Sequence, residues 1–227
     1  LNDPYYNRLI YKNYRYEVEI ENFLKKIKKI NYVFFDVGAN YGYWSSIVSS
    51  KEFGTQRAIA IEPVKKNFFM CKVNCKLNNS RFAIINKGIS NIRGTKEIYI
   101  DNSTSSSVGS SLLKPKNKLY QKETIEIIPI VKILKKYKKS KYLIIKLDIE
   151  GEETKCLKTI NHKTKNKLLI IYEDHGNDKK NIPTRYLLQK KYNVFIGLGN
   201  KFFKIKKHTD LNKYKKQKTI GYNLFAT

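Results

Sequence analysis

Glycines and carboxylates cluster directly after predicted strands of this sequence, where α/β proteins bind their ligands. The first cluster is Asp36-Val37-Gly38-Ala39-Asn40-Tyr41-Gly42, which follows the apolar run Tyr32–Asp36. Gly38 permits a tight turn with close approach of a ligand to the backbone, and Gly42 lets the next helix begin beside the strand. The pattern is not the GxGxxG of pyrophosphate-binding folds. Its leading acid suits a ligand that carries an ammonium or a sulfonium group instead.

A second carboxylate, Glu62, ends the next predicted strand, Arg57–Glu62, and is followed by Pro63. A carboxylate at this position can accept both hydrogen bonds of a ribose diol. Each pattern alone is weak, but their order, spacing and strand context together favour an adenosine-type cofactor.

A third set of residues, suited to proton transfer, lies at the ends of two later predicted strands. Asp148 and Glu150 lie at the end of the predicted strand Tyr142–Ile149 or directly after it. Glu173, Asp174 and His175 lie in the same way at the end of the predicted strand Lys167–Glu173. Neighbouring strand ends meet on the ligand side of such a sheet. His175 is a candidate general base because imidazole exchanges protons near neutral pH. In the less favoured alternative, Asp148, Glu150 and Asp174 hold a divalent cation that lowers the pKa of an alcohol.

The elements that must position these residues alternate between strands and helices. Further strands are predicted at 82–86, 97–100, 124–130, 193–197 and 219–226, and helices at 17–29, 43–49, 64–77, 131–141, 152–160 and 182–191. This alternation predicts a mostly parallel sheet with helices on both faces. The lysine-rich segment Lys201–Lys218 is predicted to be a connection. We expect one domain over 1–227, with an N-terminal helical extension (1–30) and a catalytic core (31–227).

Three segments resemble signatures of the FkbM family of S-adenosylmethionine-dependent methyltransferases. Phe34–Tyr43 is similar to its motif I, and Ala60-Ile61-Glu62-Pro63 with Asn67 to its hydrophobic-x-E-P-x-x-x-N signature. Lys146–Glu153 is similar to its K-x-D-x-E-G-x-E block. The resemblance spans about Tyr32 to the C-terminus and is patchy through residues 95–140.

The resemblance implies a Rossmann-like class I methyltransferase fold, whose seven-stranded sheet has one late antiparallel strand. It implies S-adenosylmethionine as cofactor, S-adenosylhomocysteine as product, and O-methylation of a sugar, glycan or small-molecule hydroxyl. Carried over by position, the methionine end of the cofactor contacts Asp36, Gly38, Ala39, Asn40 and Gly42. The other expected cofactor neighbours are Glu62, Pro63, Gly88, Ile89 and Asp148, and the expected catalytic residues are Asp148, Glu150 and His175.

The net charge of +27, from 46 Lys and Arg against 19 Asp and Glu, attracts anionic partners such as RNA. However, only six of the basic residues are Arg, and Lys is the weaker residue for bidentate phosphate recognition. Two alternatives therefore stay open: an RNA methyltransferase acting on the cap or the ribose 2′-hydroxyl, and a non-catalytic module that binds anions or nucleic acid. The spacing of Lys146, Asp148 and Glu150 differs from the Lys-Asp-Lys-Glu tetrad typical of RNA ribose methyltransferases.

The three cysteines, Cys71, Cys75 and Cys156, have no CxxC spacing, which argues against a disulfide framework and a zinc site. They favour a reducing, cytoplasmic location. No apolar run approaches the roughly 18 residues of a membrane helix, and Leu1–Arg8 lacks an apolar secretory core. We therefore expect neither a transmembrane segment nor a signal peptide.

Overall fold

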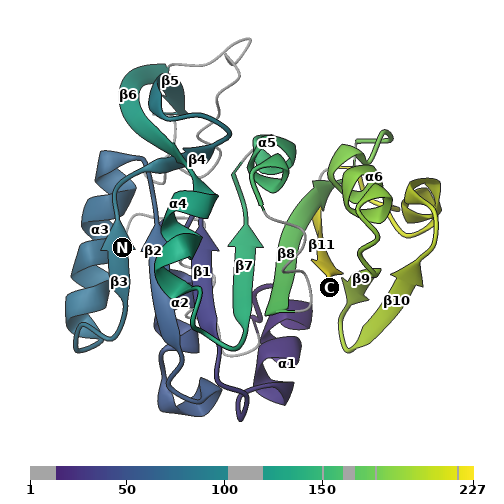
Figure 1. Cartoon of the computed structure of the whole chain (residues 1–227), viewed down its shortest axis with the longest axis horizontal. Coiled ribbons are helices and arrows are strands. Elements are labelled where there is room, and N and C mark those ends of the chain that lie inside the picture. The colour runs from purple at the N-terminus through teal and green to yellow at the C-terminus, as the bar shows by residue number, and fades with distance from the viewer. Residues whose placement is uncertain (1–13, 102–119, 150, 161–166, 177, 219) are drawn as a thin grey trace.

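The computed structural model describes residues 14–101, 120–149, 151–160, 167–176, 178–218 and 220–227. Its central sheet contains β1 (Val33–Val37), β2 (Arg57–Ile61), β3 (Ala83–Ile85), β7 (Leu143–Leu147), β8 (Leu168–His175), β9 (Val194–Leu198), β10 (Lys201–Ile205) and β11 (Gly221–Ala226). The strand order is β10-β9-β11-β8-β7-β1-β2-β3 (Figure 1). β3, β2, β1, β7 and β8 are parallel, whereas β11 runs antiparallel to both β8 and β9. This is the predicted Rossmann-like architecture with a late antiparallel strand.

The sheet has eight strands rather than the predicted seven. The additional strand is β10, which pairs antiparallel with β9 across a turn at Gly199. The prediction that Lys201–Lys218 is only a connection is therefore wrong, since the segment holds β10 and the 3-10 helix His208–Lys213. Lysines are common on edge strands because they discourage pairing with other chains, and here they hide the strand pattern.

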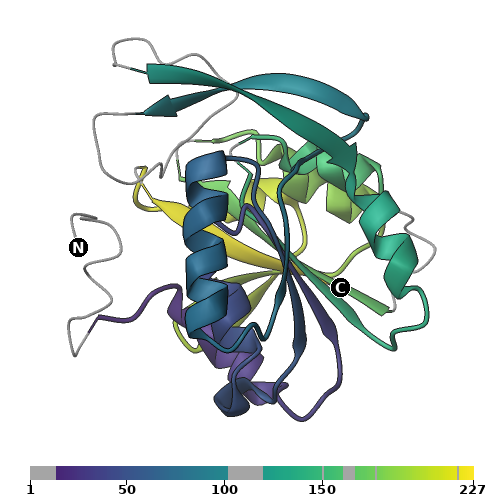
Figure 2. The same ribbon diagram turned by 90° about the vertical axis from the view of Figure 1, so that its left-hand side faces the viewer.

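Helices cover both faces of the sheet, as predicted (Figure 2). α1 (Val18–Lys26), α2 (Tyr43–Val48) and α3 (Lys65–Leu77) contribute to one apolar core, and α4 (Ile130–Leu134), α5 (Glu153–Lys158) and α6 (Ile182–Gln189) to the other. Short 3-10 helices lie at Lys51–Phe53 and Lys135–Tyr137. The neighbours Phe34 and Phe35 on β1 enter opposite cores, which explains the unbroken apolar run of this central strand.

The irregular stretch in the middle of the sequence forms a second, three-stranded sheet. It contains β4 (Gly88–Ser90), β5 (Gly94–Asp101) and β6 (Tyr120–Pro129) in the order β4-β6-β5. The strand predicted at 97–100 is confirmed within β5, and the strand predicted at 124–130 is confirmed as part of β6 except for Ile130, which begins α4. This small sheet has its own apolar cluster and lies beyond the carboxyl ends of β1 and β2 (Figures 1 and 2). The Ser-rich loop predicted at 102–111 lies outside the described residues.

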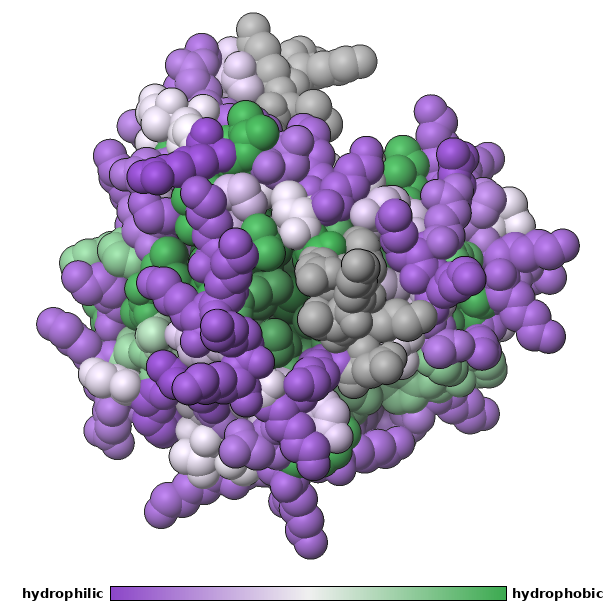
Figure 3. Space-filling view, viewed as in Figure 1, coloured by the Kyte–Doolittle hydropathy of each residue, from purple (hydrophilic) through white to green (hydrophobic). Residues whose placement is uncertain are grey.

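Hydrophilic side chains cover most of the molecular face in Figure 3, and apolar side chains show in a hollow near its centre and in smaller patches around it. The thiols of Cys71, Cys75 and Cys156 are free and buried. Within the described parts of the chain, every helix is too short or too polar to cross a lipid bilayer.

Candidate active site

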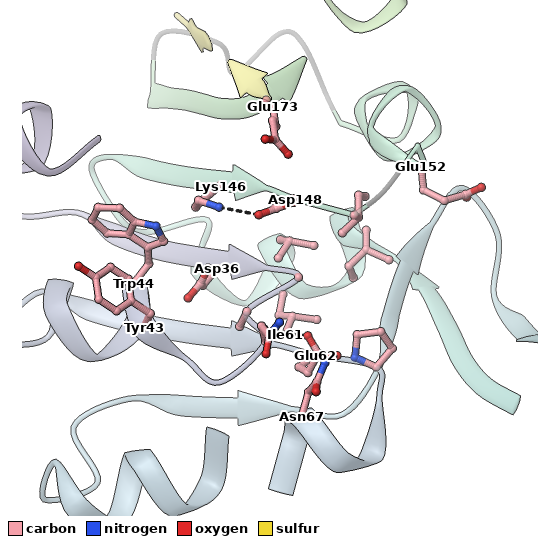
Figure 4. Close-up of a pocket in the computed structure, with 18 of the residues that line it drawn as sticks. Asp36, Tyr43, Trp44, Ile61, Glu62, Asn67, Lys146, Asp148, Glu152 and Glu173 are labelled. Carbon is pink, nitrogen blue, oxygen red and sulfur yellow. Dashed lines mark hydrogen bonds and ion pairs between the residues drawn. The ribbon is translucent and has the colours of Figure 1, made fainter. Parts of the chain in front are cut away.

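A cavity of about 720 Å³ lies at the carboxyl ends of the parallel strands, and this volume suits a cofactor-sized ligand. Its floor comes from the ends of β1, β2, β7 and β8, and β4, β5 and β6 supply one wall. Residues 14–19, which lead into the first turn of α1, supply another wall. Figure 4 shows the polar side chains that enter this space.

The glycine loop between β1 and α2 forms one side of the cavity through Gly38, Ala39 and Asn40. Gly38 has a φ of 81°, and a Cβ at this position would lie 1.8 Å from the backbone oxygen of Asp148. The missing side chain therefore lets two loops meet. Asp36 is buried, and its Oδ2 accepts hydrogen bonds from Ser45 N at 3.0 Å and from Ser45 Oγ at 2.9 Å. These bonds fix the end of β1 to the start of α2, across the glycine loop.

Glu62 joins the glycine loop to the start of α3 from the end of β2. Its Oε2 accepts from Asn40 N at 2.8 Å, and its Oε1 accepts from Val64 N at 2.9 Å and Asn67 Nδ2 at 3.4 Å. Burial raises the pKa of Glu62 to about 7. The buried Oδ1 atoms of Asn40 and Asn67, both residues of the cavity lining, have no hydrogen-bond partner among the described residues.

A buried lysine, Lys146, lies among carboxylates at the opposite side of the cavity (Figure 4). Its Nζ is 3.0 Å from Asp148 Oδ2 and 3.6 Å from Glu17 Oε2. Burial alone lowers the pKa of Lys146, but the charges of Asp148, Glu17 and Asp36 raise it well above its ordinary value. The lysine is therefore a permanent cation that holds these acids together.

Glu17 brings the N-terminal segment into this cluster. It precedes α1 with a φ of 45°, and its Oε2 accepts a hydrogen bond from Trp44 Nε1 at 2.5 Å. Burial raises the pKa of Glu17 even though Lys146 acts in the opposite direction. The start of α1 thus supplies part of the cavity as well as core packing.

Glu173 completes the cluster from β8. Leu147 of β7 is in register with Tyr172 of β8, so the residues that follow them, Asp148 and Glu173, lie at the same level. Asn223 of β11 is in register with Glu173 and also lines the cavity. Burial and the charge of Asp148 raise the pKa of Glu173 to about 7.

The sequence of the chain matches the family described as the methyltransferase FkbM domain over residues 36–197, which is more than half of its length. The chain belongs to the FkbM methyltransferase family. Membership makes the protein a methyltransferase and implies S-adenosylmethionine as methyl donor. The implied fold agrees with the observed one.

Two solved structures share the fold of this FkbM methyltransferase at low sequence identity. Methyltransferase FkbM from Methylobacillus flagellatus KT has a TM-score of 0.53 and 15% identity, and the match covers 87% of this chain and 44% of that one. The FkbM methyltransferase described here therefore spans less than half of that protein's length. Precorrin-6y C5,15-methyltransferase from Geobacter metallireducens GS-15 has a TM-score of 0.51 and 11% identity, covering 96% and 91% of the two chains. No curated protein matches the chain.

Most of the residues expected to contact the cofactor line this cavity of the FkbM methyltransferase. They are Asp36, Gly38, Ala39, Asn40, Glu62, Pro63, Gly88, Ile89 and Asp148. Gly42, also expected beside the cofactor, is not among the residues that line the cavity. A Cβ on Gly42 would lie 2.7 Å from Cys71 Sγ, so this glycine serves the packing of α2 against α3.

Asp148 and Asp174, the two described residues of the alternative metal site, do not come together as predicted. Asp174 points toward α6, where it forms a buried ion pair with Lys215 and accepts a hydrogen bond from Thr184 Oγ1 at 3.3 Å. It does not line the cavity that contains Asp148, so the metal hypothesis is wrong for Asp174. Glu150 lies outside the described residues. His175 lines the cavity but is exposed at its rim.

The glutamates that follow Glu150 in the FkbM block have structural partners. Glu153 Oε1 accepts from Ile149 N at 3.1 Å and its Oε2 accepts from Gly151 N at 3.0 Å, which closes the turn before α5. Glu152 lines the cavity, and its Oε2 accepts from Ser90 Oγ at 2.9 Å. It therefore ties α5 to the small sheet.

Sequence reasoning missed Glu17 and Asn223 and did not choose Glu173 from its group of three polar residues. The alternation of side chains along a strand could have identified these polar residues, because residues two positions apart face the same side of the sheet. Lys146, Glu173 and Asn223 each lie two positions from a residue of one apolar core, namely Ile144, Ile171 and Phe225 respectively. The start of α1 carried no comparable signal.

Proposed function

We propose that this methyltransferase transfers the methyl group of S-adenosylmethionine to a hydroxyl oxygen of a neutral sugar, glycan or other small molecule. The observation that carries the proposal is the set of carboxylates at one end of the cavity, Glu17, Asp148 and Glu173, around a single buried lysine. Carboxylates accept hydrogen bonds from hydroxyl groups and repel phosphates.

The residues at the other end of the cavity fit the implied cofactor. Glu62 ends β2, where a carboxylate can accept from a ribose diol, and the unpartnered Oδ1 of Asn67 provides a further acceptor beside it. Buried polar atoms normally have partners, so Asn67 is suited to a ligand that donates a hydrogen bond. When bound, S-adenosylmethionine supplies a methyl group on a positively charged sulfur, already activated for displacement.

The protein must align the acceptor hydroxyl and remove its proton, since a neutral alcohol is a poor nucleophile. We propose that Asp148 orients the acceptor, because Lys146 fixes its carboxylate at the cavity floor. His175 lies at the rim, where it can contact the part of the acceptor that extends outward.

The cations of the cavity lining favour this acceptor class over RNA. Lys96 Nζ lies 3.3 Å from Glu152 and Arg15 Nη2 lies 3.0 Å from Glu21, while Lys87 pairs with Glu126. With Lys146 enclosed, each lysine and arginine in the described lining already has a carboxylate partner. A phosphate backbone would have to compete for them. RNA stays the alternative acceptor because of the net charge of +27.

The acceptor class can be tested directly with methyl-labelled S-adenosylmethionine. The purified protein would be incubated in parallel with neutral oligosaccharides, hydroxylated small molecules, and capped and uncapped RNA. We expect label in a hydroxylated neutral acceptor and a methyl ether in its mass spectrum. Label on the RNA ribose would contradict the proposal in favour of the RNA alternative. Absence of cofactor binding in calorimetry would support the non-catalytic module.

The raised pKa of Glu62 gives a second test, on cofactor affinity. Ribose hydroxyls donate to the ionised carboxylate, so affinity should rise as the pH passes upward through about 7. We expect about tenfold weaker binding at pH 6 than at pH 8, and Glu62→Gln should remove this dependence and weaken binding at pH 8 about 10- to 100-fold. Calorimetric titration of both proteins measures this. Equal pH dependence in the variant would contradict the assignment of Glu62.

The proposal extends to the domain organisation and the cellular location of the protein. We retain a single methyltransferase domain over 1–227, supported by the apolar core that α1 shares with the central sheet. We also retain a cytoplasmic location, supported by the three free thiols.

A further inference from the structure

Glu173 is a carboxylate of the cavity lining that a ligand can reach. It stands on β8 between Asp148 of β7 and Asn223 of β11, and its carboxylate points into the space above Asp148 (Figure 4). The residue is only half-buried, whereas Lys146 beside it is buried. A ligand in the cavity can therefore reach the Glu173 carboxylate.

Gly221 of β11 leaves room for this carboxylate. A Cβ built on Gly221 would lie 1.3 Å from Glu173 Oε1 and 2.0 Å from Glu173 Cδ. The backbone conformation of Gly221 is ordinary, since its φ is not positive. Because Gly221 has no side chain, the Glu173 carboxylate fits against its backbone at the cavity wall.

Burial and the charges around Glu173 bring the pKa of its carboxyl group close to neutral pH. The groups that face it are Asp148 and Lys146 on β7, Glu17 before α1, His175 on its own strand and Asn223 on β11. Burial and the negative charges of Asp148 and Glu17 raise its pKa, His175 and Lys146 lower it, and the net result is about 7. General bases are most effective when their pKa lies near the working pH.

The other candidates are less suited to this role. Asp148 Oδ2 already accepts a hydrogen bond from Lys146 Nζ at 3.0 Å, so this oxygen is engaged within the protein. His175 is exposed at the rim of the cavity. Glu173 lies deeper than His175 and is not bonded to Lys146 in the way that Asp148 is.

We infer that Glu173 is the general base of the methyl transfer, an inference that rests on the proposed O-methylation. The hydroxyl oxygen of the acceptor forms a bond to the methyl carbon while the carbon–sulfur bond breaks and its electron pair stays on sulfur. The hydroxyl proton moves to the Glu173 carboxylate and then to solvent. Asp148, held in place by Lys146, orients the acceptor hydroxyl toward Glu173.

The test compares Glu173→Gln with wild type and with Glu52→Gln, which removes an exposed carboxylate far from the cavity lining. We expect Glu173→Gln to lower kcat about 100-fold or more while cofactor affinity stays within threefold. With cofactor saturating at every pH, so that Glu62 does not contribute, the wild-type kcat/KM for the acceptor should rise with pH to a plateau above about 7, and this rise should be absent in Glu173→Gln. Glu52→Gln should match wild type in both. Because glutamine removes a partly buried charge, the variant should unfold at the same or a higher temperature.

A direct titration gives a readout that needs no acceptor. Carbon-13 NMR of the glutamate carboxyl groups in the cofactor-free protein should show two resonances titrating near pH 7, one that Glu62→Gln removes and one that Glu173→Gln removes. An ordinary carboxyl titration for Glu173, or loss of the pH-dependent rise in His175→Gln instead, would overturn the inference. If wild type transfers methyl groups only to a nitrogen or carbon acceptor, the proposed function fails, and Glu173 as base to a hydroxyl fails with it.

Discussion

Replacing Gly38 with alanine should abolish detectable cofactor binding and methyl transfer. The new Cβ would lie 1.8 Å from the Asp148 backbone oxygen and 2.8 Å from its carbonyl carbon, and backbone atoms cannot rotate aside as a flexible side chain can. The φ of 81° adds backbone strain. Relief requires the glycine loop and the Asp148 turn to move apart, which displaces both sides of the cofactor site. We expect a loss of about 3 kcal/mol or more in the free energy of unfolding.

The matched control for this variant is Gly199→Ala. Gly199 also has a positive φ, of 59°, but no described atom lies within 4 Å of the added Cβ. It should therefore show the cost of backbone strain alone, about 1 kcal/mol, with cofactor binding unchanged. Denaturant unfolding and calorimetry measure both quantities. Wild-type cofactor affinity in Gly38→Ala would show that the contact between the two loops is dispensable.

The sequence predicted the half of the site that depends on local patterns. β1 and β2 are buried apolar runs that end in Asp36-x-Gly38 and Glu62-Pro63, so strand, turn and ligand side can all be inferred from adjacent residues. The family signatures strengthen these inferences. The signatures do not distinguish the roles of the two glycines in the loop. Gly38 lines the cavity, whereas Gly42 packs against Cys71 of α3.

The other half of the site depends on register between distant strands. Glu173, Asp174 and His175 are consecutive, and only the pairing of β8 with β7 and β11 decides that Glu173 faces Asp148 while Asp174 faces α6. Glu17 reaches the cavity through a left-handed backbone conformation that a helix-charge pattern does not reveal. Long-range pairing, rather than local propensity, determines these positions.

Lys215 illustrates the same difficulty and leads to a strong stability prediction. It belongs to the lysine-rich segment predicted to be a basic connection, yet its side chain is 2% exposed. Its Nζ pairs with Asp174 and donates to His175 O at 2.9 Å, Asp178 O at 2.8 Å and Asn181 Oδ1 at 2.6 Å. This one lysine therefore fixes the chain that follows β8, next to Glu173.

We expect Lys215→Met to lower the free energy of unfolding by about 3–5 kcal/mol, because it leaves the Asp174 carboxylate buried without its cation. Lys213→Met, two residues earlier and with a 79% exposed side chain, should leave stability unchanged although it removes the same charge. Adding Asp174→Asn to Lys215→Met should restore part of the loss, since no buried charge then stays unpaired. Thermal and denaturant unfolding of the three variants provide the measurement. Equal stability of Lys215→Met and Lys213→Met would mean that Lys215 behaves as one more surface charge, and that the basic composition of this segment contributes nothing to holding the end of β8 in place.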